Sequence, residues 1–234
     1  MDVAAVVRGT GARVLQRGAD GQLRENELHA ADLSQVVGEI CIDSRERTRD
    51  ALFVALPGVR SDGHAFVPEV LRAGARGCLI KSEHAADLAP LLPAGELRYL
   101  FVVNDPLIAL QRLAANWREA HRATIIGITG SIGKTTSKEI IAGLLATRWS
   151  VLRSIANLNT EIGLPLMLLR LAEHHHIVVL EMGMYAAGDI ADLARIARPE
   201  IGVVTTVEPI HLERMGSLER IARTKSELIA ALPT

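Results

Sequence analysis

The sequence predicts an α/β protein in two parts, a small amino-terminal α/β domain and a domain built on a parallel sheet. Three observations support this prediction. From residue 124 onward, apolar runs typical of buried strands alternate with helical patterns. A glycine-rich turn at residues 127–136 lies between one such run and the next helical pattern. The pattern before His121 is more mixed, so we place the two domains at residues 1–122 and 123–234.

In the first part, short apolar runs are separated by glycine and proline, which mark turns. Asp105 is a good helix N-cap, and Pro106 fits the first helical position after it. The expected helices are 2–8, 66–75 and 107–120, and the expected strands begin near 14–16 and lie at 39–43, 51–56, 78–80 and 100–103.

In the second part, the expected strands are 124–128, 151–153, 177–181 and 201–205, and the expected helices are 134–147, 162–172, 188–197 and 217–231. Strands that are apolar throughout indicate a parallel sheet with helices on both faces. A ligand of such a sheet lies beyond the carboxyl ends of its strands. The glycine-rich turn, Glu181 and the segment after Thr205 all follow such ends.

Composition excludes several classes of protein. Hydrophobic residues make up 49% of the 234, enough for a substantial core, and the net charge of −1 argues against broad binding to nucleic acid or to an anionic membrane. Cys41 and Cys78 lack C-x-x-C spacing and are expected to be buried, reduced thiols. No apolar run reaches the length of a membrane span, and residues 1–8 do not resemble a secretory signal. We therefore expect a cytoplasmic protein.

The glycine-rich turn, Gly127-Ile128-Thr129-Gly130-Ser131-Ile132-Gly133-Lys134-Thr135-Thr136, is the most informative string. A turn between a strand and a helix presents backbone N–H groups and the positive helix end to an anion. Lys134 can reach the β- and γ-phosphates of a nucleotide, and the Thr135 hydroxyl can ligate Mg²⁺. Ile128 stands where the strict phosphate-loop pattern has glycine, and a chance turn is the alternative. The expected ATP-binding residues are Thr129, Gly130, Ser131, Gly133, Lys134, Thr135 and Thr136.

Other polar residues are less specific. Glu181 ends an apolar strand and suits Mg²⁺, although a helix-capping acid is the alternative. His211 is a borderline Mg²⁺ ligand and could be structural, and Lys225 alone would be an ordinary solvated helix lysine. Residues 174–176 are three histidines that we expect to form an exposed connection rather than a metal site.

Three polar segments could bind parts of a second phosphorylated ligand or of a nucleotide. The amides and hydroxyl of Asn157, Asn159 and Thr160 precede a helix, where ordinary loop capping is an equal alternative. In the first part, polar strings follow two expected strands, but many surface loops look similar. The residues concerned there are Ser44, Arg45, Gly63, His64 and Phe66.

Taken together, these strings resemble the Mur ligase family, and their order and spacing cover nearly the whole chain. They are Ile42-Asp43-Ser44-Arg45, Leu52-Phe53-Val54-Ala55-Leu56, Asp62-Gly63-His64-Ala65-Phe66, Thr129-Gly130-Ser131-Ile132-Gly133-Lys134-Thr135-Thr136, Asn157-Leu158-Asn159-Thr160-Glu161-Ile162-Gly163-Leu164-Pro165, Glu181-Met182-Gly183-Met184, Arg198-Pro199, and His211-Leu212-Glu213 through Gly216-Ser217-Leu218-Glu219 to Lys225.

The resemblance implies ATP-dependent amide-bond synthesis. In the family, ATP phosphorylates a carboxylate of a UDP-N-acetylmuramoyl peptide, and an amine then attacks the acyl phosphate to give amide, ADP and phosphate. The strings look most like the member that adds D-alanyl-D-alanine to the tripeptide in peptidoglycan precursor synthesis. The implied partners are therefore UDP-N-acetylmuramoyl peptide and D-Ala-D-Ala, with ATP and two Mg²⁺ ions as cofactors.

The resemblance also implies roles for single residues. Lys134 contacts phosphate, Thr135 and Glu181 serve the first Mg²⁺, and His211 serves a second. Lys225 matches the lysine that the family carries as a carbamate, which makes it an anionic metal ligand. Lys134, Lys225 and His211 are thus the implied catalytic residues. The residues implied to hold the UDP end are Ser44, Arg45, Gly63, His64 and Phe66, and Asn157, Asn159 and Thr160 would meet the diphosphate or sugar.

The chain departs from the family in two respects. Thr206 stands where asparagine is usual, and Glu208 and Ile210 stand where small residues are usual. The family also continues well beyond Lys225, so we expect this chain to be the first half of a ligase, with a truncated ATPase domain, and to be monomeric. Two alternatives remain open: a sister ligase that adds a diamino acid to the dipeptide precursor, and a module that binds UDP-sugar or ATP without turnover.

Overall fold

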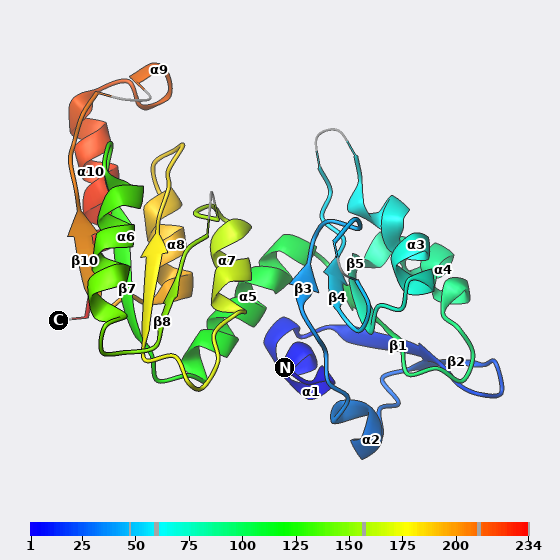
Figure 1. Cartoon of the computed structure of the whole chain (residues 1–234). Coiled ribbons are helices and arrows are strands. Elements are labelled where there is room, and N and C mark those ends of the chain that lie inside the picture. Colours follow the sequence, from blue (N-terminus) through cyan, green and yellow to red (C-terminus); the bar gives the residue numbers. More distant parts are fainter. Residues whose placement is uncertain (47, 59–60, 156–157, 210–211, 234) are drawn as a thin grey trace. The chain divides into compact units, whose positions relative to one another are not determined.

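The computed structural model of the chain describes residues 1–46, 48–58, 61–155, 158–209 and 212–233 (Figure 1). Its contacts divide the chain into two compact units, Met1–Leu113 and Ala114–Thr234. The division between the two units falls within the helix Pro106–Glu119. The expected domain boundary after residue 122 stays a prediction. Among the described residues, no helix is both long and apolar enough to cross a membrane.

The first unit is a six-stranded sheet in the order β2-β1-β6-β5-β4-β3. Strands β3 to β6 are parallel, and β1 pairs antiparallel with both β2 and β6. The elements are α1 (Val3–Thr10), β1 (Arg13–Arg17), β2 (Leu23–Glu25), α2 (Ala30–Leu33), β3 (Ile40–Cys41), β4 (Leu52–Val54), the 3₁₀ helix η1 (Gly63–Phe66), α3 (Val67–Arg72), β5 (Gly77–Lys81), η2 (Ser82–His84), α4 (Ala85–Leu88), η3 (Ala89–Leu91) and β6 (Tyr99–Val103). Helix α5 (Pro106–Glu119) begins in this unit and ends in the second.

The core of this unit follows the alternation of its strands. Inward side chains of five strands pack with α3 and α4 in one cluster that includes Phe53, Cys78 and Leu100. Both cysteines are buried and free, as the sequence predicted, and burial raises the pKa of the Cys41 thiol to about 12. The thiols are therefore inert packing groups.

The second unit is a four-stranded parallel sheet in the order β10-β7-β9-β8. Its elements are β7 (Thr124–Thr129), α6 (Lys134–Leu145), β8 (Val151–Arg153), α7 (Gly163–Leu168), β9 (Ile177–Glu181), α8 (Asp189–Ala197), β10 (Ile201–Val204), α9 (Leu212–Met215) and α10 (Leu218–Ala230). Strand β7 lies between β9 and β10, so the loop that follows it has strand ends on both sides.

Helices cover both faces of this sheet, as apolar strands require. Helix α6 packs on one face against Ile126, Ile128 and Val179, and α7, α8 and α10 pack on the other. The carboxylate of Glu227 on α10 accepts hydrogen bonds from the amides of Gly188 and Ala191, at 2.9 and 3.0 Å. This carboxylate caps α8 and ties α10 to it.

The α/β fold is confirmed, with a parallel sheet in the second unit and a mixed sheet in the first. The strands expected at 151–153 and 177–181 have the observed bounds, and Asp105 caps α5 by accepting from the amides of Leu107 and Ile108. The predicted helix 162–172 is too long, since α7 ends at Leu168 and tighter backbone bonds follow it. The short elements β2, α2, α4 and α9 are absent from the predicted elements, and the strands β3 and β4 are shorter than expected.

Candidate functional site

The glycine-rich loop lies at the carboxyl end of β7 and leads directly into α6, whose first residue is Lys134. Gly130 has φ +149°, and a Cβ there would lie 1.9 Å from the Thr205 hydroxyl oxygen. Gly133 has φ +86° and is the N-cap of α6. The backbone conformation of the loop therefore requires glycine at both positions.

The ammonium of Lys134 lies over this loop. Its Nζ donates to the carbonyl oxygen of Gly130 at 2.7 Å and to that of Ser131 at 3.4 Å. Backbone amides at a helix N-terminus favour an anion, and this ammonium lies beside them. The phosphate contact of Lys134 stays a prediction.

Glu181 brings three of the predicted site residues together. Its Oε2 accepts a hydrogen bond from the Thr135 hydroxyl at 2.9 Å, and its Oε1 accepts one from the Asn159 amide at 3.0 Å. Glu181 is only 4% exposed and lies at the end of β9, beside β7. A hydroxyl and a carboxylate are the hard oxygen donors that Mg²⁺ prefers, so these residues fit that ion.

The segment after β10 holds the same loop from the other side. The amide of Ser131 donates to the Thr206 carbonyl at 2.9 Å, and the amide of Ile132 donates to the Thr206 hydroxyl at 3.0 Å. Ser131 Oγ lies 2.8 Å from the amide of Glu208, which donates to it. Thr206 and Glu208, two departures from the family pattern that lie in the described residues, thus contact the glycine-rich loop, Glu208 through its backbone.

Lys225 on α10 is 2% exposed, which overturns the solvated-lysine interpretation. Its Nζ lies 3.8 Å from the sulfur of Met184. Burial first, and the charge of Lys134 second, lower the pKa of the Lys225 amine to about 8. A buried amine that can be neutral near physiological pH distinguishes Lys225 from an ordinary helix lysine.

Other predicted residues of this unit have simpler surroundings. Thr160 Oγ1 accepts from the amide of Gly163 at 3.2 Å, at the start of α7, and the buried Thr129 hydroxyl has no hydrogen-bond partner in the described part of the chain. Thr136 is exposed on the first turn of α6. Asn157 and His211 lie outside the described residues.

The three consecutive histidines connect α7 to β9, as expected. His174 and His176 are exposed, and Nδ1 of His175 accepts from the amide of Ala172 at 3.0 Å. The described residues contain no metal-like cluster at this connection.

The candidate residues of the first unit also follow the ends of parallel strands. Ser44 and Arg45 come after β3, and Gly63, His64 and Phe66 form η1, after β4. The Arg45 side chain is exposed and bonds to the carboxylate of Asp43 at 2.8 Å, which lowers the pKa of that acid to about 2. A Cβ at Gly63 would lie 2.8 Å from the backbone of Leu56. Only glycine therefore allows this turn to pack against the residues that follow β4.

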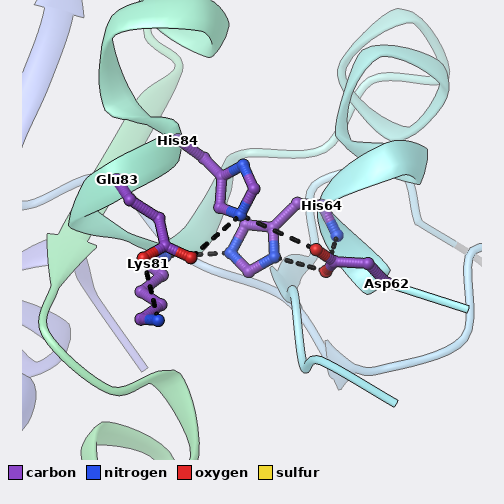
Figure 2. Close-up of polar contacts among 5 residues, drawn as sticks. All are labelled: Asp62, His64, Lys81, Glu83 and His84. Atoms are coloured by element: carbon purple, nitrogen blue, oxygen red, sulfur yellow. Dashed lines mark hydrogen bonds and ion pairs between the residues drawn. The ribbon is translucent and has the colours of Figure 1, made fainter. Parts of the chain in front are cut away.

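Figure 2 shows a polar cluster around His64, which is 4% exposed. Nδ1 of His64 lies 2.6 Å from Asp62 Oδ1, and Nε2 accepts the Lys81 amide at 2.9 Å. A neutral imidazole has one nitrogen lone pair, and the Lys81 amide uses it, so Nδ1 carries the proton. His64 is therefore the Nδ1–H tautomer and fixes η1 to the end of β5.

The stacked ring of His84, 4.0 Å from His64 between centroids, completes this cluster. Asp62, His64 and His84 have ligand atoms close enough for a metal ion. The geometry argues against one, because His64 has no lone pair to offer while it accepts the Lys81 amide. We interpret the cluster as a support for the turn at η1.

Comparison with known proteins identifies the two domains. Residues 36–118 match the Mur ligase family catalytic domain, and residues 128–234 match the Mur ligase middle domain. A UDP-N-acetylmuramoyl-tripeptide–D-alanyl-D-alanine ligase of Synechocystis is 42% identical over 197 residues, which cover 84% of this chain and 42% of that protein. The Bacillus subtilis enzyme of the same name is 39% identical over 197 residues, with coverage of 84% and 42%.

Solved structures show the same likeness. A crystal structure of MurF from Acinetobacter baumannii aligns with a TM-score of 0.80 at 28% identity, over 99% of this chain and 46% of that one. MurF from Thermotoga maritima in complex with ADP aligns with a TM-score of 0.71 at 37% identity, over 84% and 44%. The chain spans less than half the length of the curated relatives it matches. The two matched domains, the named relatives and the fold together show that the chain belongs to the Mur ligase family.

Proposed function

We propose that this chain supplies the UDP-substrate and ATP sites of a ligase that joins D-alanyl-D-alanine to a UDP-N-acetylmuramoyl tripeptide. The observation that carries the proposal is the pairing of Thr135 with Glu181 beside Lys134, at adjacent ends of β7 and β9. The names of the relatives support the choice of substrates over a diamino acid. The proposed place is the cytoplasm, as a monomer, in peptidoglycan synthesis and thereby in cell wall biogenesis, cell shape and cell division.

The phosphate loop acts first in the proposed mechanism. Lys134 exchanges the carbonyls of Gly130 and Ser131 for oxygens of the β- and γ-phosphates, while loop amides and the start of α6 orient them. The expected contacts come from Thr129, Gly130, Ser131, Gly133, Thr135 and Thr136. Transfer of the γ-phosphoryl group to the tripeptide carboxylate gives an acyl phosphate and ADP. Attack by the amine of D-Ala-D-Ala then forms the amide and releases phosphate.

Magnesium, when bound, neutralises charge on the phosphates in this reaction. Thr135 and Glu181 would hold the first ion, and His211 with Lys225 would hold a second. The lowered pKa of Lys225, about 8, supports its proposed carbamylation, because a neutral amine can add CO₂ with loss of a proton. A carbamate oxygen would then face the metal in place of an ammonium.

The tripeptide substrate is proposed to bind through its UDP end to residues 1–122, with the ATP site in residues 123–234. Arg45 and the turn at Gly63 and Phe66 offer a cation, backbone and a half-exposed ring for the nucleotide. His64 contributes by holding this turn, since both of its ring nitrogens are engaged. Asn157, Asn159 and Thr160 are proposed to meet the diphosphate or sugar.

The test is calorimetry and thermal melting of the 234-residue chain with MgATP and, separately, with UDP-N-acetylmuramoyl tripeptide. Each ligand should bind and raise the melting temperature. Lys134→Met should abolish the effect of ATP and keep that of the UDP compound. Arg195→Met, which removes an exposed cation of α8 that pairs with Asp192, is the control and should change neither. If neither ligand protects the wild-type chain, the proposal is wrong.

Turnover separates the remaining alternatives. We expect the isolated chain to bind its ligands without completing ligation, because it spans less than half of its relatives. In a protein completed with the carboxyl-terminal half of a relative, D-Ala-D-Ala should stimulate phosphate release and a diamino acid should not. The reverse preference would identify the sister ligase. Binding without turnover in the completed protein would identify a non-catalytic module.

A further inference from the structure

Two buried polar residues that are not among the predicted site residues connect α6 to Glu181. Lys138 and Ser154 are each 2% exposed. Lys138 Nζ donates to the Ser154 carbonyl at 2.8 Å, and Ser154 Oγ accepts the backbone amide of Glu181 at 3.0 Å. The first contact links α6 to the segment after β8, and the second links that segment to the end of β9.

Together with the hydrogen bond between Thr135 and Glu181, these contacts form a closed ring through α6, Ser154 and Glu181, which we call the circuit. Thr135 and Lys138 are both on α6, three residues apart, so they lie one turn from each other on the same side. Thr135 donates to the carboxylate of Glu181, and Lys138 reaches the backbone of Glu181 through Ser154. The position of Glu181 relative to α6 is therefore fixed twice, once at its side chain and once at its main chain.

The charge of Lys138 makes this arrangement hard to explain as ordinary packing. Burying an ammonium carries a large desolvation cost, which an apolar residue on the same face of α6 would avoid. The ammonium does have partners, the Ser154 carbonyl and Glu139 Oε1 at 3.0 Å. Glu139 also pairs with Arg153 at the end of β8, at 3.1 Å. The whole group therefore ties α6 to the chain around Ser154.

We propose that Lys138 and Ser154 are positioning residues for the metal–nucleotide site, which hold Glu181 at the depth at which its carboxylate and Thr135 can share one Mg²⁺ ion. This inference rests on the proposed function. Mg²⁺ demands nearly ideal octahedral geometry, so a small displacement of one ligand weakens it. Lys134 Nζ bonds to the carbonyls of Gly130 and Ser131, so we expect its proposed phosphate contacts to be independent of Glu181. Loss of the circuit should therefore weaken the Mg²⁺-dependent part of ATP binding and leave the metal-free part unchanged.

The experiment is calorimetric titration of the 234-residue chain with ATP, in Mg²⁺ and in EDTA. Ser154→Ala removes the acceptor of the Glu181 amide, and the gain in affinity from Mg²⁺ should fall about tenfold, as for other residues that support metal ligands. Ser154→Thr keeps the hydroxyl and should restore the gain. The matched control is Ser34→Ala, which removes an exposed hydroxyl bonded to the Ala31 carbonyl in the first unit and should have no effect.

Lys138→Met tests the other half of the circuit, with a side chain of similar length and no charge, and should lose the Mg²⁺ gain in the same way. It also carries the test if Ser154→Ala does not fold. A wild-type chain that gains nothing from Mg²⁺ contradicts the proposed function itself. A wild-type gain that both variants keep overturns the inference. Equal weakening with and without Mg²⁺ also overturns it, because it shows only general support of the fold.

Discussion

The hydroxyl of Thr206 accepts a hydrogen bond from the amide of Ile132, at 3.0 Å, so a side chain after β10 holds the glycine-rich loop after β7. Thr206→Val keeps the shape and removes this acceptor. We expect the Ile132 amide to exchange with deuterium about fivefold faster, which is the loss of one hydrogen bond of about 1 kcal/mol.

The neighbouring amide is an internal control for that exchange measurement. Ser131 donates to the backbone carbonyl of Thr206, which the substitution retains, so its exchange should change less. Equal acceleration of both amides would mean that the loop opens as a unit and that the hydroxyl has no particular role.

Gly130→Ala should destabilise the chain by more than about 2 kcal/mol, because φ there is +149° and the new methyl would overlap the Thr205 hydroxyl. Gly143→Ala is the matched control. Gly143 lies within α6 with no atom within 4 Å of an added Cβ, so alanine should stabilise the helix by about 0.5–1 kcal/mol. Urea unfolding of both variants measures the difference, and shifts of the same sign would contradict the described loop.

Lys225 should make the free energy of unfolding depend on pH in the alkaline range. Its pKa is lowered from 10.5 to about 8 by burial and by Lys134, so the unfolded chain holds more protons between these values. Stability should therefore rise as the pH increases from about 8 to 10.5, and should not change through this group below pH 8.

The comparison with Lys225→Met isolates that contribution from other titrating groups. The variant lacks the cost of a buried ammonium, so it should be more stable at pH 7 by about 1–3 kcal/mol, and the advantage should shrink toward pH 10.5. Urea unfolding across this range gives both curves. Parallel curves would show that the amine is solvated.

His64 should be the Nδ1–H tautomer, which ¹⁵N chemical shifts of the ring nitrogens report directly. His64→Leu should cost about 1–3 kcal/mol, since it leaves the Lys81 amide without its acceptor. His84→Leu should cost less, because that ring is 31% exposed and its nearest carboxylate oxygens are 3.6 Å away. An Nε2–H signal from His64 would contradict the hydrogen bond to Lys81.

The sequence predicted best where one local pattern decides the structure. Both ends of strand β9 agree with the prediction, because a continuous apolar run ends there at a charged residue, Glu181. Strand β2 was missed because Leu23 is its single apolar residue, and its pairing with β1 decides its conformation. Helix α7 was drawn too long because apolar residues continue beyond Leu168 into a turn that also packs against the core.

The site divides in the same way. The loop at Lys134 and the acid at Glu181 stand at strand ends, which sequence reveals. Lys138 could not be distinguished from a surface lysine, because its burial depends on the chain around Ser154, sixteen residues later. Lys225 was recovered only through the family resemblance, since a helical pattern does not show that an amine is buried.

The cap that Glu227 places on α8 has a consequence for its neighbour on α10. A helix rises about 1.5 Å per residue, so an anchor at Glu227 sets how deep Lys225, two residues earlier, enters the protein. The depth of the Lys225 amine is thus set by the hydrogen bonds of Glu227 to the amides of Gly188 and Ala191. A substitution that shifts the start of α8 can therefore change the burial of Lys225, and with it the pKa of its amine, without contacting that residue.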